Sequence, residues 1–385
     1  MNNHIIGDLL EYVIGGGWGS EAPDGDQNTP NYVIRSADFP SIEKGSFDGV
    51  PLRFDVLNFV NKRSLQDGDI LLEISGGTKN RPTGRTVYIS EKLLSSVEHA
   101  VIPASFCRLL RFKKEVVFPK YMYYLLQSWW ASGGSWEFQN QSTGIANFQF
   151  KIFAEKFEVS LPPLEEQERI AGILGSLDDK IEANTRLIQT MDSYKSTLFQ
   201  AHICSESEGE TIKVSDVATL IRENIAASDI DESMNYVALE HIPRHSLYSH
   251  EWTNSEGVMS NKSGFKVGDI LFGKLRPYFH KVSIAAVDGI ASTDILVLRP
   301  KPGFEVLAQS VLSSEDLIEY ATQVSSGTRM PRASWKDIMN YEVTVKNVEI
   351  LQELLSGFDA YSRALIHENK VLTETRDALI KRLIG

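Results

Sequence analysis

The sequence predicts an α+β fold: two tandem strand-rich α/β domains, each followed by a long α-helix. Three observations predict it. Residues 161–182 read LPPLEEQERIAGILGSLDDKIE, and a weaker copy, VKNVEILQELLSGFDAYSRALI, follows at 345–366. The tetrapeptide GDIL at 68–71 recurs at 268–271, and Ser142-Thr143-Gly144 is echoed by Ser325-Ser326-Gly327. An internal repeat of this size indicates two copies of one structural unit.

The first predicted domain covers residues 1–160. Apolar or alternating runs at 70–74, 86–90 and 156–161 are typical of strands. Glycine-rich segments such as GGGWGS and SGGTKNRPTG separate them as loops. The run PKYMYYLLQSWW at 119–130 predicts a helix. Together these features predict a mixed, strand-rich domain.

The first long helix is predicted at residues 164–199, within a spacer region of residues 161–205. Pro162 and Pro163 suit a helix start, where a missing N–H costs nothing. Acidic residues in the first turn oppose the positive end of the helix dipole. The polar stretch 202–211 is a plausible hinge into the second predicted domain, residues 206–345. The second long helix is predicted within residues 346–385.

Each long helix carries an apolar seam with one polar position, Asn184 in the first and Asn369 in the second. A polar residue at such a position can fix the register of a coiled coil. Two helices of about 35 residues, each roughly 50 Å long, need a partner for their seams. We expect them to pair as an antiparallel coiled coil with pseudo-two-fold symmetry. An alternative is two ordinary amphipathic helices with Asn at the edge of the seam. The predicted pairing residues are Ile170, Leu174, Leu177, Ile181, Asn184, Ile188, Leu355, Phe358, Ile366, Asn369 and Leu372.

LPPLEEQERI followed by a long helix, duplicated behind two variable domains, resembles the specificity subunit of Type I restriction-modification systems. The resemblance implies two target-recognition domains that read a bipartite, asymmetric site in double-stranded DNA. It also implies a spacer of paired helices that holds the two domains at its opposite ends. Its implied partners are two adenine methyltransferase subunits and motor-nuclease subunits, which would bind the methyl donor and ATP. The chain itself would be non-catalytic and would need no cofactor.

The loop that follows each GDIL is the first candidate for DNA contact. Arginine suits guanine edges and lysine suits phosphates, and glycine lets a backbone approach closely. A solvated surface hairpin is the alternative. In the first domain the candidates are Lys79, Asn80, Arg81 and Arg85; in the second they are Lys274, Arg276, Tyr278, His280 and Lys281.

The second candidate lies around the Ser-Thr-Gly and Ser-Ser-Gly landmarks. Side-chain amides can pair bidentately with adenine, although such polar clusters are turn formers first. The candidates are Gln139, Asn140, Gln141 and Asn147 in the first domain and Ser326, Thr328, Arg329 and Arg332 in the second.

The net charge of −12 is unusual for a protein that coats DNA, which would be basic. Residues 206–345 hold 13 Lys and Arg against 20 Asp and Glu. If this region binds DNA, its cations must gather on one face, or partner subunits must neutralise most phosphates. An alternative function is therefore an assembly scaffold for methyltransferase-like partners with little DNA reading of its own. A specificity module of a related phage-defence or methylation-only system is a further alternative.

Composition and motifs bound the other possibilities. Two isolated cysteines fit a reducing cytosol, and the N-terminal residues lack the pattern of a secretory signal, so a cytoplasmic location is expected. No GxxxxGK[ST] phosphate loop occurs. His241 and His245 are four apart, but Pro243 lies between them, so no zinc helix and no metal site are predicted.

Overall fold

The structure, a computed structural model, describes residues 2–77, 81–141, 146–203, 208–248, 251–327 and 329–384. The chain forms two compact units. Unit 1 comprises Met1–Glu182 and Thr373–Gly385, and unit 2 comprises Ala183–Leu372. Each unit therefore contains a globular part and a portion of both long helices. None of the helices in the described ranges combines the length and the apolar character that a membrane span requires.

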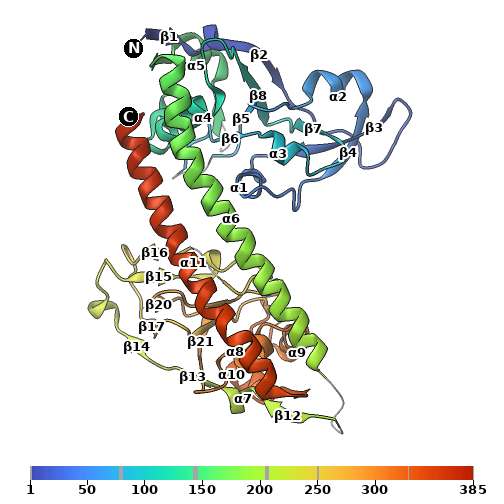
Figure 1. The fold of residues 1–385 in the computed structure, drawn as a ribbon, viewed down its shortest axis with the longest axis vertical. Coiled ribbons are helices and arrows are strands. Elements are labelled where there is room, and N and C mark those ends of the chain that lie inside the picture. The colour runs from blue at the N-terminus through green and yellow to red at the C-terminus, as the bar shows by residue number, and fades with distance from the viewer. Residues whose placement is uncertain are drawn as a thin grey trace. The chain divides into compact units, whose positions relative to one another are not determined.

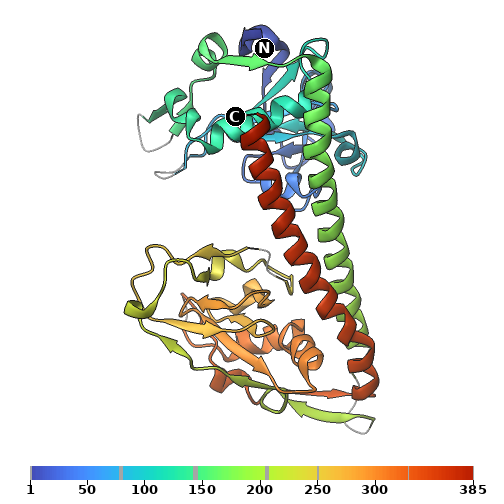
Figure 2. The ribbon, with the colours of Figure 1, turned by 60° about the vertical axis from the view of Figure 1, so that its left-hand side comes forward.

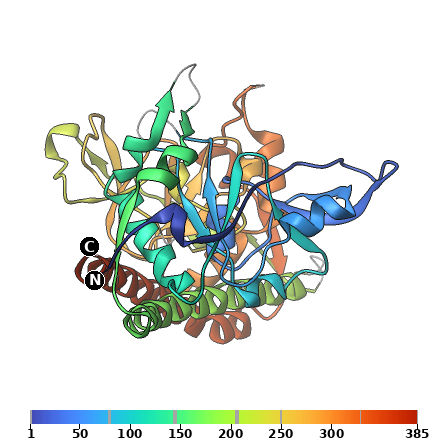
Figure 3. The same cartoon turned by 90° about the horizontal axis from the view of Figure 1, so that it is seen from above.

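Unit 1 is built on a four-stranded antiparallel sheet of order β2-β8-β5-β6. A second sheet, β4-β3-β7, contains a parallel pair between β3 and β7 and extends away from the first (Figures 1 and 3). Two short antiparallel pairs, β1-β11 and β10-β9, complete the unit. The strands are β1 Asn2–Ile5, β2 Leu10–Gly15, β3 Gln27–Ile34, β4 Leu52–Val56, β5 Ile70–Glu73, β6 Thr86–Tyr88, β7 Ala100–Pro103, β8 Cys107–Phe112, β9 Gln139–Gln141, β10 Ala146–Phe148 and β11 Glu158–Leu161.

The helices of unit 1 cover the core of the four-stranded sheet. Helix α4 packs against β6, and aromatic side chains meet beside it: the ring of Trp129 in α4 lies near those of Phe138 in the 3-10 helix η2 (Gly134–Phe138), Phe153 in α5 and Phe157. The helices are α1 Phe39–Glu43, α2 Leu57–Arg63, α3 Glu91–Leu94, α4 Pro119–Ala131, α5 Phe150–Lys156 and the beginning of α6 Leu164–His202.

Unit 2 repeats this plan. Its four-stranded sheet has the order β13-β21-β18-β19, and its first and last strands pair as β12-β22 (Figure 2). A second sheet, β14-β17-β20-β15-β16, again contains a parallel pair, β15 with β20. The strands are β12 Glu210–Lys213, β13 Ala218–Leu220, β14 Asn224–Ile225, β15 Asn235–Val237, β16 Thr253–Asn254, β17 Lys262–Phe265, β18 Ile270–Gly273, β19 Val282–Ile284, β20 Gly289–Ala291, β21 Ile295–Pro300 and β22 Glu342–Val345. The helices are α7 Val214–Val217, α8 Glu305–Leu312, α9 Glu315–Val324, α10 Trp335–Ile338 and α11 Val348–Leu383.

The two GDIL segments occupy the same place in both units. Gly68 and Gly268 both have φ near +90°, a conformation that favours glycine. The following aspartates are buried and accept two hydrogen bonds from an arginine on the neighbouring strand, Asp69 from Arg111 and Asp269 from Arg299. Each also caps its own turn, through the backbone N–H of residue 66 or 266. The repeat in sequence is thus a repeat in structure.

The two long helices are in contact and run antiparallel. In unit 1, Arg376 of α11 donates to Asp178 of α6. In unit 2, later α6 residues meet earlier α11 residues: Asn184 contacts Asn369, and the ring of Tyr194 lies 5.6 Å from that of Phe358. Residues later in α6 therefore contact residues earlier in α11, as antiparallel helices do (Figures 1 and 2). The first turns of one helix and the last turns of the other join the core of each unit.

The structure has the direct Asn184–Asn369 contact rather than an arrangement with both amides at the seam's edge. The other predicted seam residues are buried or half-buried along the helices. Buried are Ile170, Leu174, Ile188, Leu355 and Ile366; half-buried are Leu177, Ile181, Phe358 and Leu372. The first helix is longer than predicted, because it continues to His202.

Candidate nucleic-acid interface

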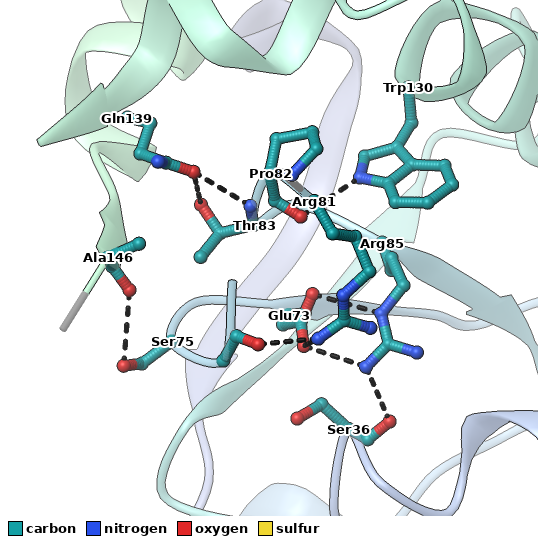
Figure 4. A network of polar contacts seen from close by, with 11 residues as sticks. Ser36, Glu73, Ser75, Arg81, Pro82, Thr83, Arg85, Trp130, Gln139 and Ala146 are labelled. Atoms are coloured by element: carbon teal, nitrogen blue, oxygen red, sulfur yellow. Dashed lines mark hydrogen bonds and ion pairs between the residues drawn. The ribbon is translucent and has the colours of Figure 1, made fainter. Parts of the chain in front are cut away.

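The two candidate segments of unit 1 lie side by side. The loop after β5 meets β10, where the N–H of Phe148 donates to the carbonyl of Ile74 at 2.8 Å. Ser75 forms an isolated bridge with Asn147, and its Oγ donates to the carbonyl of Ala146 at 3.3 Å (Figure 4). Segments about 70 residues apart in the chain are thereby joined into one surface loop cluster.

Unit 2 joins its two candidate segments by equivalent bonds. The N–H of Ala333 donates to the carbonyl of Lys274 at 3.0 Å, and Leu275 bridges Arg332. Lys274 and Leu275 lie 200 residues after Ile74 and Ser75. Ala333 and Arg332 lie 185 residues after Phe148 and Asn147. Both spacings are offsets of the sequence repeat. The same juxtaposition is therefore built twice, once in each unit.

The loop of unit 1 is organised around Glu73, whose side chain is fully buried at the end of β5. Arg85 donates to this carboxylate from Nε at 3.1 Å and from a terminal nitrogen at 2.8 Å, and also to the carbonyl of Ser36. Arg81 lies 3.8 Å from the same carboxylate and donates to the carbonyl of Gly76 (Figure 4). A buried carboxylate requires such partners.

Gly76 is required beside this carboxylate. Its φ of +147° lies in a region that L side chains rarely adopt, and a Cβ there would lie 2.5 Å from Glu73 Oε1. The loop can therefore turn over the buried ion pair only because residue 76 has no side chain.

The guanidinium of Arg85 is engaged inside the unit by Glu73 and Ser36, and its contact with DNA stays a prediction. Arg81 remains half-exposed. Gln139 is also partly engaged: its Oε1 accepts from the N–H of Thr83 at 2.9 Å and from the Thr83 hydroxyl at 3.3 Å. Gln139 thus positions the loop.

The amides of the β9–β10 hairpin differ in exposure. The side chains of Asn140 and Asn147 are exposed, and the two residues pair across the hairpin. Gln141 pairs with Ala146 through its backbone, but the structure does not describe its side chain. Three other predicted DNA contacts lie outside the described residues altogether: Lys79, Asn80 and Thr328. Asn140 and Asn147 are therefore the hairpin amides that the structure presents to solvent.

Unit 2 separates its candidates into inward and outward groups. His280 is buried, and its ring nitrogens lie against Ser313 and Glu315. Lys281 Nζ donates to the carbonyl of Leu239. Burial lowers the pKa of both groups, and nearby Arg244 lowers that of Lys281 further. Both side chains are engaged within the unit, and their contact with DNA stays a prediction.

The outward group of unit 2 comprises Tyr278, Ser326, Arg329 and Arg332, all exposed, with Lys274 and Arg276 half-buried. Arg332 lies 3.3 Å from Asp294, an exposed pair of the kind that contributes little to stability. Arg276 adopts a left-handed backbone with φ of +52°, and its N–H donates to the carbonyl of Pro331 at 2.7 Å. Arg276 and Arg332 therefore lie at the junction of the two segments.

Comparison with known proteins finds a family model that matches part of the chain. Residues 6–192 match the model described as the Type I restriction modification DNA specificity domain. The Type I restriction enzyme EcoDI specificity subunit of Escherichia coli is 29% identical over 126 residues, which are 30% of this chain and 28% of that protein. The chain therefore spans well under two thirds of that curated relative.

A solved structure extends the likeness to the whole chain at the level of fold. The crystal structure of a Type I restriction-modification system S subunit from M. genitalium covers 100% of this chain and 96% of its own, with a TM-score of 0.55. Its sequence identity is 14%. The two chains therefore share a fold.

Proposed function

We propose that this chain, whose residues 6–192 match the model of the Type I restriction modification DNA specificity domain, is the DNA sequence-specificity subunit of a Type I restriction-modification complex. Each unit reads one half of a bipartite, asymmetric double-stranded target. The chain is non-catalytic and cytoplasmic. Adenine methylation is carried by two methyltransferase subunits, and ATP-dependent cleavage by motor-nuclease subunits, all assembled on this chain.

The observation that carries the proposal is the repeated junction of two polar loop segments. Functional loops on rigid sheets are typical of binding proteins. Both junctions follow the buried Asp–Arg pair of the four-stranded sheet. Both are also held by equivalent backbone hydrogen bonds. Their outward side chains differ: amides dominate in unit 1, whereas arginines and a tyrosine dominate in unit 2. Two equivalent backbone arrangements that present different side chains suit two half-sites of different sequence.

A second candidate function is an assembly scaffold that reads little or no DNA sequence. It is favoured by the acidic composition of residues 206–345, which hold 20 Asp and Glu against 13 Lys and Arg. It is also favoured by the bonds of His280 and Lys281, two of the predicted DNA contacts, to carbonyl groups within unit 2. Phosphate affinity depends on such cations, so under the first proposal the partner subunits neutralise part of the DNA backbone.

A methylome separates the two candidates. We would co-express the chain with the methyltransferase subunit encoded beside it and map adenine methylation across the host genome by long-read sequencing. A split, asymmetric motif that disappears without this chain supports sequence reading. Replacing the globular part of unit 1 alone must then change one half of the motif only. A complex that assembles but methylates without sequence preference supports the scaffold instead.

A further inference from the structure

Three potential metal ligands meet in unit 2 outside the surface described above. His245 lies in a turn three residues before Tyr248, which forms a bridge with Ile284 of β19. His280 directly follows the 3-10 helix η5 (Pro277–Phe279), and Glu315 is the first residue of α9. Glu315 Oε1 lies 3.2 Å from Nδ1 of His245 and 3.1 Å from Nδ1 of His280. The three ligand atoms lie within 4.8 Å of one another. This cluster unites three segments of one unit.

The hydrogen bonding of His280 leaves the lone pair of Nδ1 facing an oxygen of Glu315, which is also an acceptor. Its Nε2 lies 2.9 Å from the carbonyl oxygen of Ser313, and a carbonyl can only accept, so Nε2 carries the proton. In the neutral ring Nδ1 is then an acceptor, and it faces a carboxylate oxygen at 3.1 Å. Two acceptors at this distance need a cation between them: a second proton on the ring or a metal ion.

The surroundings of the ring fit the metal. A histidine that binds a metal commonly donates its other N–H to a backbone carbonyl, which fixes the ring and its tautomer. Ser313 supplies this carbonyl, and the His280 side chain is only 7% exposed. The backbone also joins the two histidine segments, since the N–H of His245 donates to the carbonyl of His280 at 3.0 Å.

The distances also fit. In a tetrahedral zinc site with bonds of roughly 2.0–2.1 Å, neighbouring ligand atoms lie roughly 3.3 Å apart. The two Nδ1 atoms lie 3.2 and 3.1 Å from Glu315 Oε1 and within 4.8 Å of each other. Two histidines and a carboxylate are a ligand set used by Zn²⁺ and related ions. The side chains of His245 and Glu315 are 60% and 68% exposed, so water has access to the fourth position.

We propose that His245, His280 and Glu315 bind one transition-metal dication of the zinc class, with water completing the coordination. The sequence predicted no metal site. His241, four residues before His245, is not part of the cluster, and its Nδ1 accepts from the N–H of Ala238. The proposed ion joins η5, which follows Arg276, to α9, which precedes Ser326. It would therefore hold together the two loop segments of unit 2. That consequence rests on the proposed function, whereas metal binding does not.

The test is metal binding by the full-length chain carrying no histidine tag. After treatment with a chelator, Co²⁺ is titrated and followed by its visible absorption, and Zn²⁺ binding is measured by calorimetry. We expect one ion per chain, with the absorption of a nitrogen–oxygen site and no thiolate band. Because both residues are exposed, His245→Ala and Glu315→Gln should keep the fold and weaken binding by at least about 10–100-fold.

Matched controls come from the same unit. His367→Ala removes an exposed histidine of α11, and Glu319→Gln removes an exposed glutamate of α9; neither should change affinity. Failure of the wild-type chain to bind one ion would overturn the proposal, and so would equal losses in the controls and the ligand variants. A thiolate band would also overturn it, because it would place the ion on a cysteine. Loss of sequence-specific methylation with metal binding intact would concern the proposed function alone.

Discussion

Asn184 of α6 donates from Nδ2 to Oδ1 of Asn369 in α11 at 2.9 Å, and the two residues are 185 positions apart, the offset that aligns the two halves of the sequence. Both are buried. Two identical amides cannot bond symmetrically, since one must donate and the other accept. The spare N–H groups therefore find different partners: Asn184 donates also to Glu368, and Asn369 donates to Thr185.

We expect this amide pair to contribute through register more than through net stability. Asn369→Leu should cost roughly 1–3 kcal/mol because it leaves a buried amide without its partner. The double variant Asn184→Leu/Asn369→Leu should cost less than the sum of the single variants, with a coupling of roughly 0.5–3 kcal/mol. Urea unfolding of the four proteins in the cycle measures this coupling. Additive losses would show that the amides do not act as a pair.

The repeated Asp–Arg pairs allow a matched comparison between the two units. Arg111 and Arg299 both bind a buried aspartate with two bonds of 2.7–2.8 Å, but their side chains are 18% and 41% exposed. Removing one partner of a buried pair costs roughly 3–5 kcal/mol. We expect Arg111→Ala to approach that cost and Arg299→Ala to cost less, because water reaches its pair more easily.

Hydrogen exchange can locate these losses, because it reports the protection of individual strands. Protection of β5 should fall in Arg111→Ala, and protection of β18 should fall to a smaller extent in Arg299→Ala. A larger loss at β18 would contradict the ranking by exposure.

Local patterns in the sequence predict much of this fold. The strand starting at Ile70 and the helix starting at Pro119 follow from runs of apolar residues with turn signals at their ends. The long helices follow from their apolar seam and acidic first turn. The repeat then places the same elements in the second half. Periodicity and punctuation are local properties, so a single sequence contains them.

The partners of charged side chains have no such local signal. Arg85 lies in a loop whose composition predicts DNA contact, yet its partner Glu73 and the carbonyl of Ser36 become neighbours only after the sheets form. His280 likewise meets Glu315 across 35 residues. For the same reason the sequence could not show that Asp69 and Asp269 hold arginines. Site residues therefore require the tertiary fold, whereas elements do not.

Arg81 and Arg276 test DNA reading, one in each unit. If either reads a base, its replacement by alanine should weaken binding to the cognate site by about 1–3 kcal/mol and relax one half of the motif. Equal losses on all sequences, with a salt slope smaller by about one, would mean a phosphate contact. Binding is measured by fluorescence anisotropy with the assembled complex. Arg169→Ala is the control, because Arg169 is exposed on α6 and paired with Glu166. Unchanged affinity in both variants would reject the loop assignment.

Burial of Lys195 predicts that the free energy of unfolding depends on pH. Its Nζ is buried in unit 2 and donates to the hydroxyl of Tyr248 at 2.8 Å and to Gln309 at 3.3 Å. Burial lowers the pKa of Lys195 below 10.5, although Asp359 and Asp192 oppose this and Arg363 adds to it. Between the lowered pKa and 10.5 the unfolded chain binds more protons, so the free energy of unfolding rises with pH in this window. Below the lowered pKa the cost of burying the charge is fully present.

Tyr248 limits the window in which this rise can be seen. Burial raises its pKa above 10.0, so the folded state holds that proton longer and stability falls above pH 10. We therefore expect the wild-type free energy of unfolding to rise as pH approaches 10, and Lys195→Met to lose that rise. Urea unfolding over a pH series measures both, with Lys336→Met as an exposed control in the same unit. A rise of equal size in Lys195→Met would assign the pH dependence to other groups and would mean that Lys195 keeps its ordinary pKa in the folded protein.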